Sequence, residues 1–376
     1  MLSLYIHIPF CVGKCHYCGF YSTVYSPSTA VAFISALGRE AAGYHALFRE
    51  RLFESVYIGG GTPTVLSPGQ LGLVMDAVKR HFPLASDVEY TIEANPNSLS
   101  AGHLSLFREQ GVSRLSLGVQ SFSPDLLKIL GRPHTVEQAV DAFSLAREAG
   151  MSNIGIDLIY GIPGQREHQW LETVGRALDL APEHISAYAL SLDEGSRFLT
   201  DSAAGSLVLP DDESTAVQYE SVVSLLNRAG YLRYEVSNFA LPGHACRHNL
   251  NYWKRGEYLG IGPGAWSFLG NRRYQNIGDV EDYTARLIAG AGIITAEELI
   301  DSTQAANEYV MLALRTSRGI DLDRYGKEYG ARSLERLETN SERLRGSGLL
   351  ESREGRLVLT DRGFLLSNEV LTRLFR

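Results

Sequence analysis

Short runs of β-branched and aromatic residues alternate with longer amphipathic stretches over the first half of the chain. This alternation is typical of βαβ units that build a parallel sheet. The predicted strands are residues 3–8, 55–58, 88–93, 114–119, 153–159 and 184–190. The predicted helices between them are residues 29–48, 68–81, 101–110, 136–149 and 167–180. Six such strands within about 190 residues favour an α/β barrel or partial barrel over a sandwich.

Residues that a packed core would not select follow the ends of these predicted strands. The segments are 9–11 (PFC), 59–63 (GGGTP), 93–96 (EANP), 118–122 (GVQSF) and 160–164 (YGIPG), and the fifth strand carries Asp157. In parallel α/β sheets, ligands bind at the carboxyl ends of the strands. The sequence therefore predicts a ligand site at this end of the barrel.

The chain has 376 residues, 44% of them hydrophobic, and a formal net charge of −8. This composition excludes disordered, collagen-like and coiled-coil chains. The negative charge and the lack of a long basic run argue against nucleic acid as a partner. The N-terminus resembles no signal peptide, and no apolar stretch has the length of a membrane span. We expect a cytoplasmic protein, for which peripheral contact with a membrane stays open.

The second half of the chain has a different pattern of predicted elements. It predicts a helix at 212–229, a strand at 231–238, a loop from Cys246 to Trp253, and helical, Arg- and Glu-rich segments from Ala296 to a strand at 357–360. We expect a partial barrel at 1–240, a connecting segment at 241–295 and a smaller α+β, winged-helix-like domain at 296–376. This last domain carries 13 Lys and Arg against 14 Asp and Glu. A DNA-reading domain needs a positive excess, so a lid or docking role is expected instead.

Three of the four cysteines, Cys11, Cys15 and Cys18, form a C-x3-C-x2-C motif directly after the first predicted strand. Structural zinc usually takes four ligands in paired C-x2-C units, and ordinary electron-transfer [4Fe–4S] clusters take four cysteines. Three thiolates suit a [4Fe–4S] cluster whose fourth iron binds an outside ligand. Zinc binding or a purely structural role is the alternative. Clustered thiols without an export signal indicate a reducing compartment.

The cysteine motif resembles that of the radical S-adenosylmethionine (SAM) superfamily. The resemblance continues in order through residues 5–11 (YIHIPFC), 59–64 (GGGTPT), 93–96 (EANP), 118–122 (GVQSF) and 157–163 (DLIYGIP). Together these motifs are similar to the family of oxygen-independent coproporphyrinogen III oxidase (HemN) and its HemW relatives. The resemblance implies a partial (β/α)6 barrel of radical SAM type and a [4Fe–4S] cluster on Cys11, Cys15 and Cys18. It also implies that the open iron binds SAM and that electron transfer cleaves SAM to a 5′-deoxyadenosyl radical.

The resemblance also implies which residues surround SAM. Gly60, Gly61 and Thr62 would meet its amino group, because a glycine turn lets a backbone approach a ligand closely. The other residues implied by the family are Tyr5, Tyr17, Glu93, Gln120, Arg132, Asp157, Ala189 and Trp266. Trp266 stands where relatives usually have a small or aliphatic residue.

Two features divide this family. The oxidases carry a fourth cysteine two residues after the third, where this chain has Phe20. The HemW group, which resembles haem chaperones, instead carries an HNxxYW motif, present here at residues 248–253. Histidine can ligate haem iron, and aromatic rings can stack on a porphyrin. The haem-binding residues implied by this motif are His248, Asn249, Tyr252 and Trp253.

The expected function is therefore that of a haem chaperone that binds haem and transfers it to acceptor haemoproteins. One alternative is a SAM-dependent oxidoreductase that converts coproporphyrinogen III to protoporphyrinogen IX, or a HemN-like radical methyltransferase. Another is a non-catalytic binding module that carries zinc or a cluster. The resemblance implies an electron donor such as flavodoxin or ferredoxin. Cys246 receives no role from the sequence.

Overall fold

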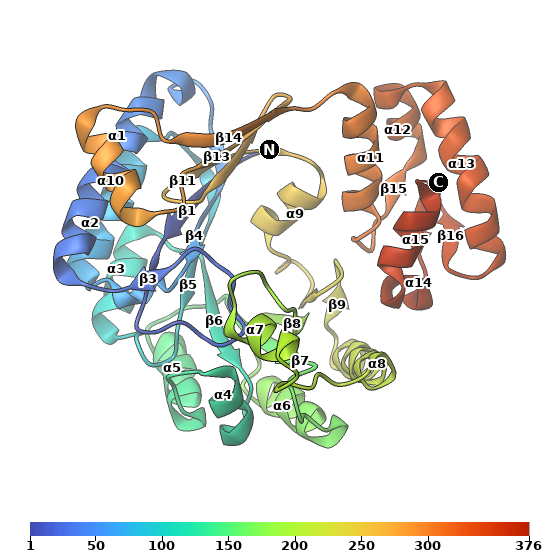
Figure 1. The fold of residues 1–376 in the computed structure, drawn as a ribbon, viewed down its shortest axis with the longest axis horizontal. Coiled ribbons are helices and arrows are strands. Elements are labelled where there is room, and N and C mark those ends of the chain that lie inside the picture. The colour runs from blue at the N-terminus through green and yellow to red at the C-terminus, as the bar shows by residue number, and fades with distance from the viewer. Residues whose placement is uncertain (376) are drawn as a thin grey trace.

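Six parallel strands form the centre of the structure, a computed structural model that describes residues 1–375 (Figure 1). The strands are β1 (Leu2–Ile8), β4 (Phe53–Gly60), β5 (Leu84–Ala94), β6 (Arg114–Gln120), β7 (Ile154–Tyr160) and β8 (His184–Ala189). Neighbours in this order pair in parallel. These are the six strands predicted from the sequence, and the α/β class is confirmed.

Helices connect these strands and lie outside the sheet (Figure 1). They are α1 (Pro27–Phe48), α2 (Pro68–His81), α3 (Ala101–Gln110), α4 (Pro124–Leu130), α5 (Val136–Glu148) and α6 (Glu167–Asp179). Only α4 was not predicted. The start of α2 shows why the boundaries could be read: Ser67 Oγ accepts from the Gln70 N–H at 3.2 Å, and the Gln70 side chain accepts from the Ser67 N–H at 3.0 Å. This reciprocal capping box satisfies two amides that a helix start leaves free.

The central strands have one polar and one apolar face, because side chains alternate along a strand. On β6, Arg114, Ser116, Gly118 and Gln120 line an inner cavity. The intervening apolar residues, from Leu115 to Val119, are fully buried in the main core. The core therefore lies between the sheet and its outer helices, and the inside of the barrel is polar.

Further strands extend the sheet at both ends. One end adds β11 (Glu257–Ile261), parallel to β1, then β12 (Trp266–Leu269), β13 (Arg272–Asn276) and β14 (Ile294–Leu299); the other adds β10 (Asn238–Ala240) and β9 (Leu232–Arg233). The remaining elements of this part are β2 (Phe10–Cys11), β3 (Thr23–Val24), the 3-10 helix η1 (Pro63–Val65), α7 (Arg197–Ala203), α8 (Asp212–Arg228), α9 (Arg247–Trp253) and α10 (Val280–Ala289). Within the described residues the hydrogen-bonded order ends at β14 and β9, as in a partial barrel.

Two local predictions for this region are wrong. The strand predicted at 231–238 is two short strands, β9 and β10, which pair with each other in antiparallel fashion. The segment predicted as a loop from Cys246 contains the helix α9, whose first backbone N–H groups, of Arg247 and His248, are bonded by Glu89 of β5. The domain boundaries stay predictions; residue 296 falls inside β14, which pairs with β13 of the large sheet.

The C-terminal part combines helices with a small antiparallel sheet of order β15-β17-β16. Its elements are α11 (Ser302–Ala313), β15 (Ile320–Asp321), α12 (Leu322–Tyr329), α13 (Ala331–Gly346), β16 (Leu350–Arg353), β17 (Arg356–Leu359), α14 (Asp361–Leu365) and α15 (Ser367–Leu374). The order from α11 to β17 is that of a winged helix, as predicted. None of the helices described in residues 1–375 combines the length and the apolar content that a membrane span requires.

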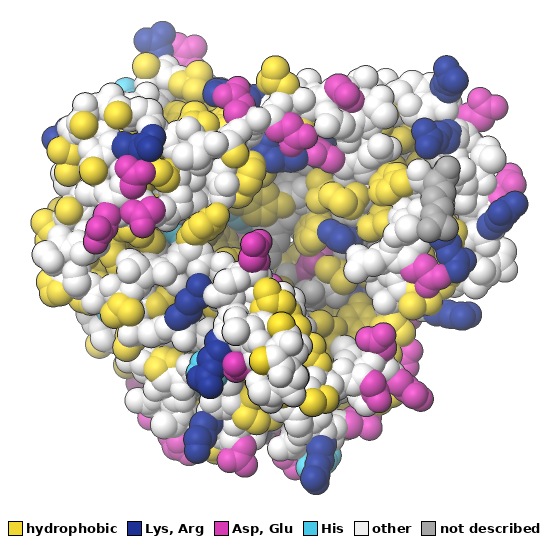
Figure 2. All heavy atoms as spheres, viewed as in Figure 1, with side chains coloured by type: hydrophobic (Ala, Val, Ile, Leu, Met, Phe, Trp, Pro, Cys, Tyr) yellow, Lys and Arg dark blue, Asp and Glu magenta, His cyan; other side chains and the backbone are white. Residues whose placement is uncertain are grey.

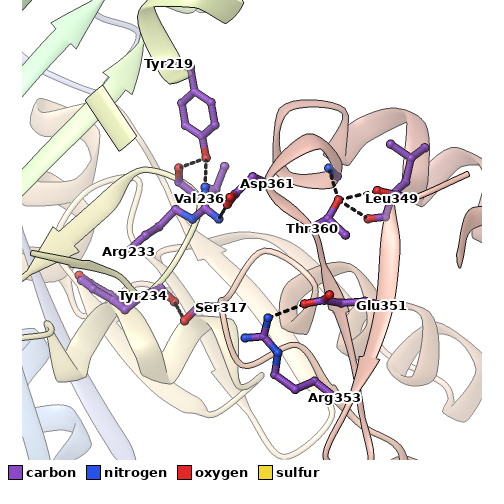
Figure 3. Close-up of polar contacts among 12 residues, drawn as sticks. Tyr219, Arg233, Tyr234, Val236, Ser317, Leu349, Glu351, Arg353, Thr360 and Asp361 are labelled. Carbon is purple, nitrogen blue, oxygen red and sulfur yellow. Dashed lines mark hydrogen bonds and ion pairs between the residues drawn. The ribbon is translucent and has the colours of Figure 1, made fainter. Parts of the chain in front are cut away.

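Arg233 of β9 joins the large sheet to the C-terminal helices (Figure 3). Its guanidinium donates to Asp361 at 2.6 Å and to the Tyr219 hydroxyl at 3.2 Å, and it lies 3.9 Å from the centre of the Phe364 ring. On the face shown in Figure 2, the molecule is hollowed between the large sheet and the C-terminal helices, and hydrophobic side chains line the hollow. The C-terminal part therefore flanks the opening of the barrel.

Candidate functional site

The three-cysteine loop is held at the carboxyl end of the barrel. Cys11 ends β2, which pairs with β3, so that the loop closes on itself. A turn bond joins the Cys18 N–H to the Cys15 carbonyl at 3.3 Å. His16 turns away, because its backbone N–H and its Nδ1 contact the carbonyls of Leu130 and Ile129, at 3.0 and 2.9 Å. His16 is thus fixed to α4 and not shared with the neighbouring cysteines.

Two polar side chains point at the thiols. Thr62 Oγ1 donates to Cys11 Sγ at 3.7 Å, and Arg132 Nη1 donates to Cys15 Sγ at 3.4 Å. Burial raises the pKa of Cys11 and raises that of Cys18 to about 11, so the uncharged thiol is the stable form of each without a metal. Among residues 1–375, no three His, Cys, Asp or Glu side chains are gathered around a single ion position. A [4Fe–4S] cluster binds each cysteine to a different iron, and three separated thiols with nearby donors fit that group.

Most of the residues implied for SAM line one cavity of about 410 Å³ beside this loop. The predicted residues brought together there are Cys11, Cys15, Cys18, Tyr17, Gly60, Gly61, Thr62, Glu93, Gln120, Arg132, Asp157, Ala189 and Asn249. They come from the ends of separate strands, as expected for a ligand site in this fold.

The glycine turn after β4 has its amide donors already engaged. Gly60 N–H donates to Glu93 at 3.1 Å, and the Gly61 and Thr62 amides donate to strand carbonyls at 2.8 and 2.7 Å. A Cβ on Gly61 would lie 2.6 Å from the Phe10 carbonyl oxygen, so only glycine fits. What this turn can offer a ligand is carbonyl oxygen, the partner that an ammonium group needs. The turn therefore fits the amino group of SAM.

Two buried carboxyl groups face the same cavity. Glu93 accepts from the Tyr57 hydroxyl at 2.8 Å, and burial raises its pKa to about 7. Asp157 accepts from Ser116 Oγ at 3.1 Å, and burial raises its pKa as well. Each retains acceptor capacity toward hydroxyl or amino groups of a ligand.

Arg132 spans the cysteine loop and two strand ends. Its Nη2 donates to Asn95 Oδ1 and to the Gly118 carbonyl, both at 2.6 Å, in addition to the contact with Cys15. Within the described residues its buried Nε has no hydrogen-bond partner. Gln120 has a φ of 67°, which turns its side chain into the cavity at the end of β6. An orphaned guanidinium nitrogen and a free amide fit a polar ligand at this position.

The remaining predicted residues do not line this cavity. Tyr5 bonds to His7 Nδ1 at 3.0 Å, and Trp266 is 40% exposed at the start of β12. Trp253 lies on α9 and is partly buried. His248 and Tyr252 pack against the strands instead.

His248 is enclosed at the base of the barrel. It is 1% exposed, its Nδ1 lies 3.0 Å from Ser55 Oγ, and its Nε2 lies 2.9 Å from the Tyr252 hydroxyl. Burial lowers its pKa to about 3. Both ring nitrogens are therefore occupied, whereas a haem ligand needs one of them free.

The position of Cys246 is explained by the same helix. Glu89 of β5 accepts from the backbone N–H groups of Arg247 and His248 at 2.9 and 3.0 Å, and the Cys246 thiol donates to it at 3.5 Å. Cys246 is fully buried and does not line the cavity beside the cluster loop. Together with these two amides, it ties the start of α9 to Glu89 of β5.

Several cavity residues were not predicted, among them Tyr57, Arg114, Ser116 and Ser186. Their signal is present in the sequence, because polar residues alternate with apolar ones along every central strand. That alternation marks a polar inner face.

The strand order, the three-cysteine loop and the cavity define a radical SAM protein. Residues 5–177 match the radical SAM superfamily, and residues 300–366 match the HemN C-terminal domain. The chain is 39% identical to Heme chaperone HemW of Bacillus subtilis, over 98% of both chains. It is 37% identical to Heme chaperone HemW of Lactococcus lactis, over 98% of this chain and 96% of the relative. The chain belongs to the HemW family.

A solved structure agrees with this assignment at the level of the fold. Coproporphyrinogen III oxidase (HemN) from Escherichia coli superposes with a TM-score of 0.86 at 24% identity, covering 99% of this chain and 89% of that one. Membership of the radical SAM superfamily implies a [4Fe–4S] cluster and SAM, and the geometry above fits both.

Proposed function

We propose that this protein is a haem chaperone that binds haem and passes it to acceptor haemoproteins. The supporting observation is similarity over 98% of the chain to relatives named Heme chaperone HemW. Phe20, which is 64% exposed at the cavity mouth, adds to this, because the oxidases of the family have a cysteine there.

In this proposal, residues of the chain hold the cluster and bind SAM. Cys11, Cys15 and Cys18 hold the cluster, and Arg132 stabilises the Cys15 thiolate by a charge-assisted hydrogen bond. The glycine turn accepts the SAM amino group, and the carboxyl groups of Glu93 and Asp157 bind its polar edges. When bound, the cluster supplies an electron for cleavage of SAM.

For haem, we propose contact through the HNxxYW motif, with unequal roles for its members. Asn249 is the member that lines the cavity, so it can touch a ligand there directly. His248 and Tyr252 bond to each other and hold α9 in place. Ligation of haem iron by His248 would require this helix to move away from Ser55.

The second candidate is an enzyme that acts on a porphyrinogen, either as an oxidase or as a radical methyltransferase. Its support is the superposition on HemN, which concerns the fold alone. In both cases an electron donor such as flavodoxin or ferredoxin would serve the cluster. We place the protein in the cytoplasm, and fractionation of cells that express a tagged chain tests this.

One anaerobic preparation separates these candidates. The purified chain is reconstituted with iron and sulfide, titrated with haem by absorbance, and then mixed with an apo-haemoprotein. Saturable haem binding with transfer to the acceptor is the expected result. The same sample is incubated with dithionite, SAM and coproporphyrinogen III, and formation of protoporphyrinogen without haem transfer would replace the chaperone by the oxidase.

A further inference from the structure

The chain that follows β8 returns to the three-cysteine loop at the carboxyl end of the barrel. β1, which leads into that loop, and β8 stand at opposite ends of the order of six parallel strands, and within residues 1–375 they do not pair with each other. We call residues 190–203, from the end of β8 to the end of α7, the bridging segment. Its contacts with the three-cysteine loop join the two ends of this strand order.

His16 is the residue of the three-cysteine loop at which this junction is made. The Phe198 N–H, in the first turn of α7, donates to the His16 carbonyl at 2.8 Å. On the other side, the His16 N–H and Nδ1 donate to the carbonyls of Leu130 and Ile129 in α4, at 3.0 and 2.9 Å. Since a carbonyl only accepts, the proton of the neutral ring is on Nδ1, and Nε2 accepts from Arg197 Nη1 at 3.3 Å. His16 is therefore held from both sides, by α4 and by α7.

A small apolar core lies beside this junction. It is formed by five buried side chains from α4, from the end of β7 with the turn after it, and from α7: Leu126, Leu130, Ile159, Ile162 and Phe198. Phe198 is 3% exposed, and its ring centre lies 5.9 Å from that of His16. Tyr17, the next residue of the three-cysteine loop, packs against the same core and lines the cavity. Phe198 thus supports two consecutive residues that lie between Cys15 and Cys18.

A second close approach fixes the part of the loop that follows Cys18. A Cβ on Gly19 would overlap the Cβ of Asp193 in the bridging segment, so only glycine lets the two backbones lie this close. The bridging segment also borders the cavity, which Leu190, Ser191 and Asp193 line. It therefore contacts the three-cysteine loop at two points and forms part of the cavity wall beside it.

We propose that the bridging segment holds the three-cysteine loop in the shape that binds the cluster, with Phe198 and His16 as positioning residues. This inference rests on the cluster site of the proposed function. Residues 12–22, all of them described, form no helix or strand, so the shape of the loop depends on its contacts with other elements. Local opening of the junction would free the loop and expose the iron to solutes, without unfolding of the barrel.

The test measures how fast a chelator removes iron from the full chain after anaerobic reconstitution and reduction with dithionite. The probe is bathophenanthroline disulfonate, whose coloured complex with ferrous iron gives the rate by absorbance. Phe198→Ala and His16→Ala should each release iron at least about tenfold faster than the wild type, because each makes local opening of the loop easier. Phe143→Ala is the matched control, since this residue of α5 is also 3% exposed but belongs to the main core. Its rate should stay within about twofold of the wild-type rate.

Two further variants separate positioning of the loop from a general loss of stability. Combining Phe198→Ala with His16→Ala should increase the rate by less than the product of the two single effects, because both remove the same contact. Phe198→Leu keeps an apolar side chain in the small core and should restore most of the wild-type rate. Fully multiplied effects would mean that the two residues act separately, which overturns the inference.

The outcomes also separate this inference from the cluster site on which it rests. A wild type that takes up no iron overturns both. With an iron-loaded wild type, unchanged rates in Phe198→Ala and His16→Ala, or an equal acceleration in Phe143→Ala, overturn the inference alone. If Phe198→Ala does not fold, the rate in His16→Ala, which leaves the five residues of the small core intact, decides the question.

Discussion

Replacing His248 by alanine should lower the stability of the fold, whether or not the residue contacts haem. The ring is 1% exposed and bonds to both Ser55 and Tyr252. Ser55 keeps a second partner, Ser3 at 2.7 Å, so the main orphan left behind is the Tyr252 hydroxyl. One buried group without a partner costs about 1–3 kcal/mol. Together with the cavity that the lost ring leaves, we expect about 2–5 kcal/mol less free energy of unfolding.

The measurement is urea unfolding of the cluster-free protein, followed by circular dichroism. Tyr252→Phe is the matched variant, because it removes the same hydrogen bond at Nε2 but keeps both rings; it should cost about 1–2 kcal/mol. The double variant should cost less than the sum of the two, since they share one contact. Haem titration is then performed at a temperature where each variant is folded.

Unchanged stability of His248→Ala would refute this reasoning, since a residue with these contacts cannot be removed without cost. A stable His248→Ala that loses the haem spectrum of the wild type would identify the histidine as an iron ligand. That result would also require α9 to lie differently when haem is bound.

Three further outcomes follow from the contacts. Gly61→Ala should lose bound iron and SAM, because its Cβ would lie 2.6 Å from the Phe10 carbonyl oxygen. Gly38→Ala is the control, since a Cβ on this residue of α1 has no neighbour within 4 Å, and this variant should keep both. Iron content and SAM binding are measured for each variant. Burial raises the pKa of Glu40 to about 7, so between pH 4.5 and 7 the folded protein keeps a proton that the unfolded chain releases. The free energy of unfolding should therefore decrease as the pH rises through this window. In Glu40→Gln this contribution to the pH dependence should vanish, as measured by unfolding at several pH values in the window. Arg233→Ala should increase hydrogen exchange in α14, because it loses the ion pair with Asp361 that Figure 3 shows and also the contact with the Phe364 ring. Arg353→Ala removes only an exposed ion pair within β16 and should leave this exchange unchanged.

The barrel could be predicted from the sequence because its signals are local. Each central strand is short and followed by a helix with its own cap, such as Ser67 with Gln70 at the start of α2. The cysteine spacing is local in the same sense. These features depend on residues a few positions apart, so they can be recognised without knowledge of the tertiary contacts.

Glu93, Gln120 and Asp157 were predicted, but polar residues deeper inside the barrel, such as Arg114 and Ser116, were not. In β6 the sequence RLSLGVQ alternates strictly, and the apolar residues were enough to identify a strand. The polar members, from Arg114 to Gln120, all face the cavity. Which of them meet one another depends on the register of neighbouring strands, and register is set by tertiary pairing. Which polar side chains share the cavity is therefore visible only in the folded chain.

The helix α9 explains the spacing of the HNxxYW motif. On a helix, residues four apart share a face, so the motif contains two pairs: His248 with Tyr252, and Asn249 with Trp253. The first pair faces the strands and is bonded to Ser55; of the second, Asn249 reaches the cavity. The first pair thus fixes the helix, and the second places the Asn249 side chain at the cavity. A loss of haem binding on changing His248 can therefore arise by displacement of Asn249, which is why stability and haem spectrum must be measured on the same variant.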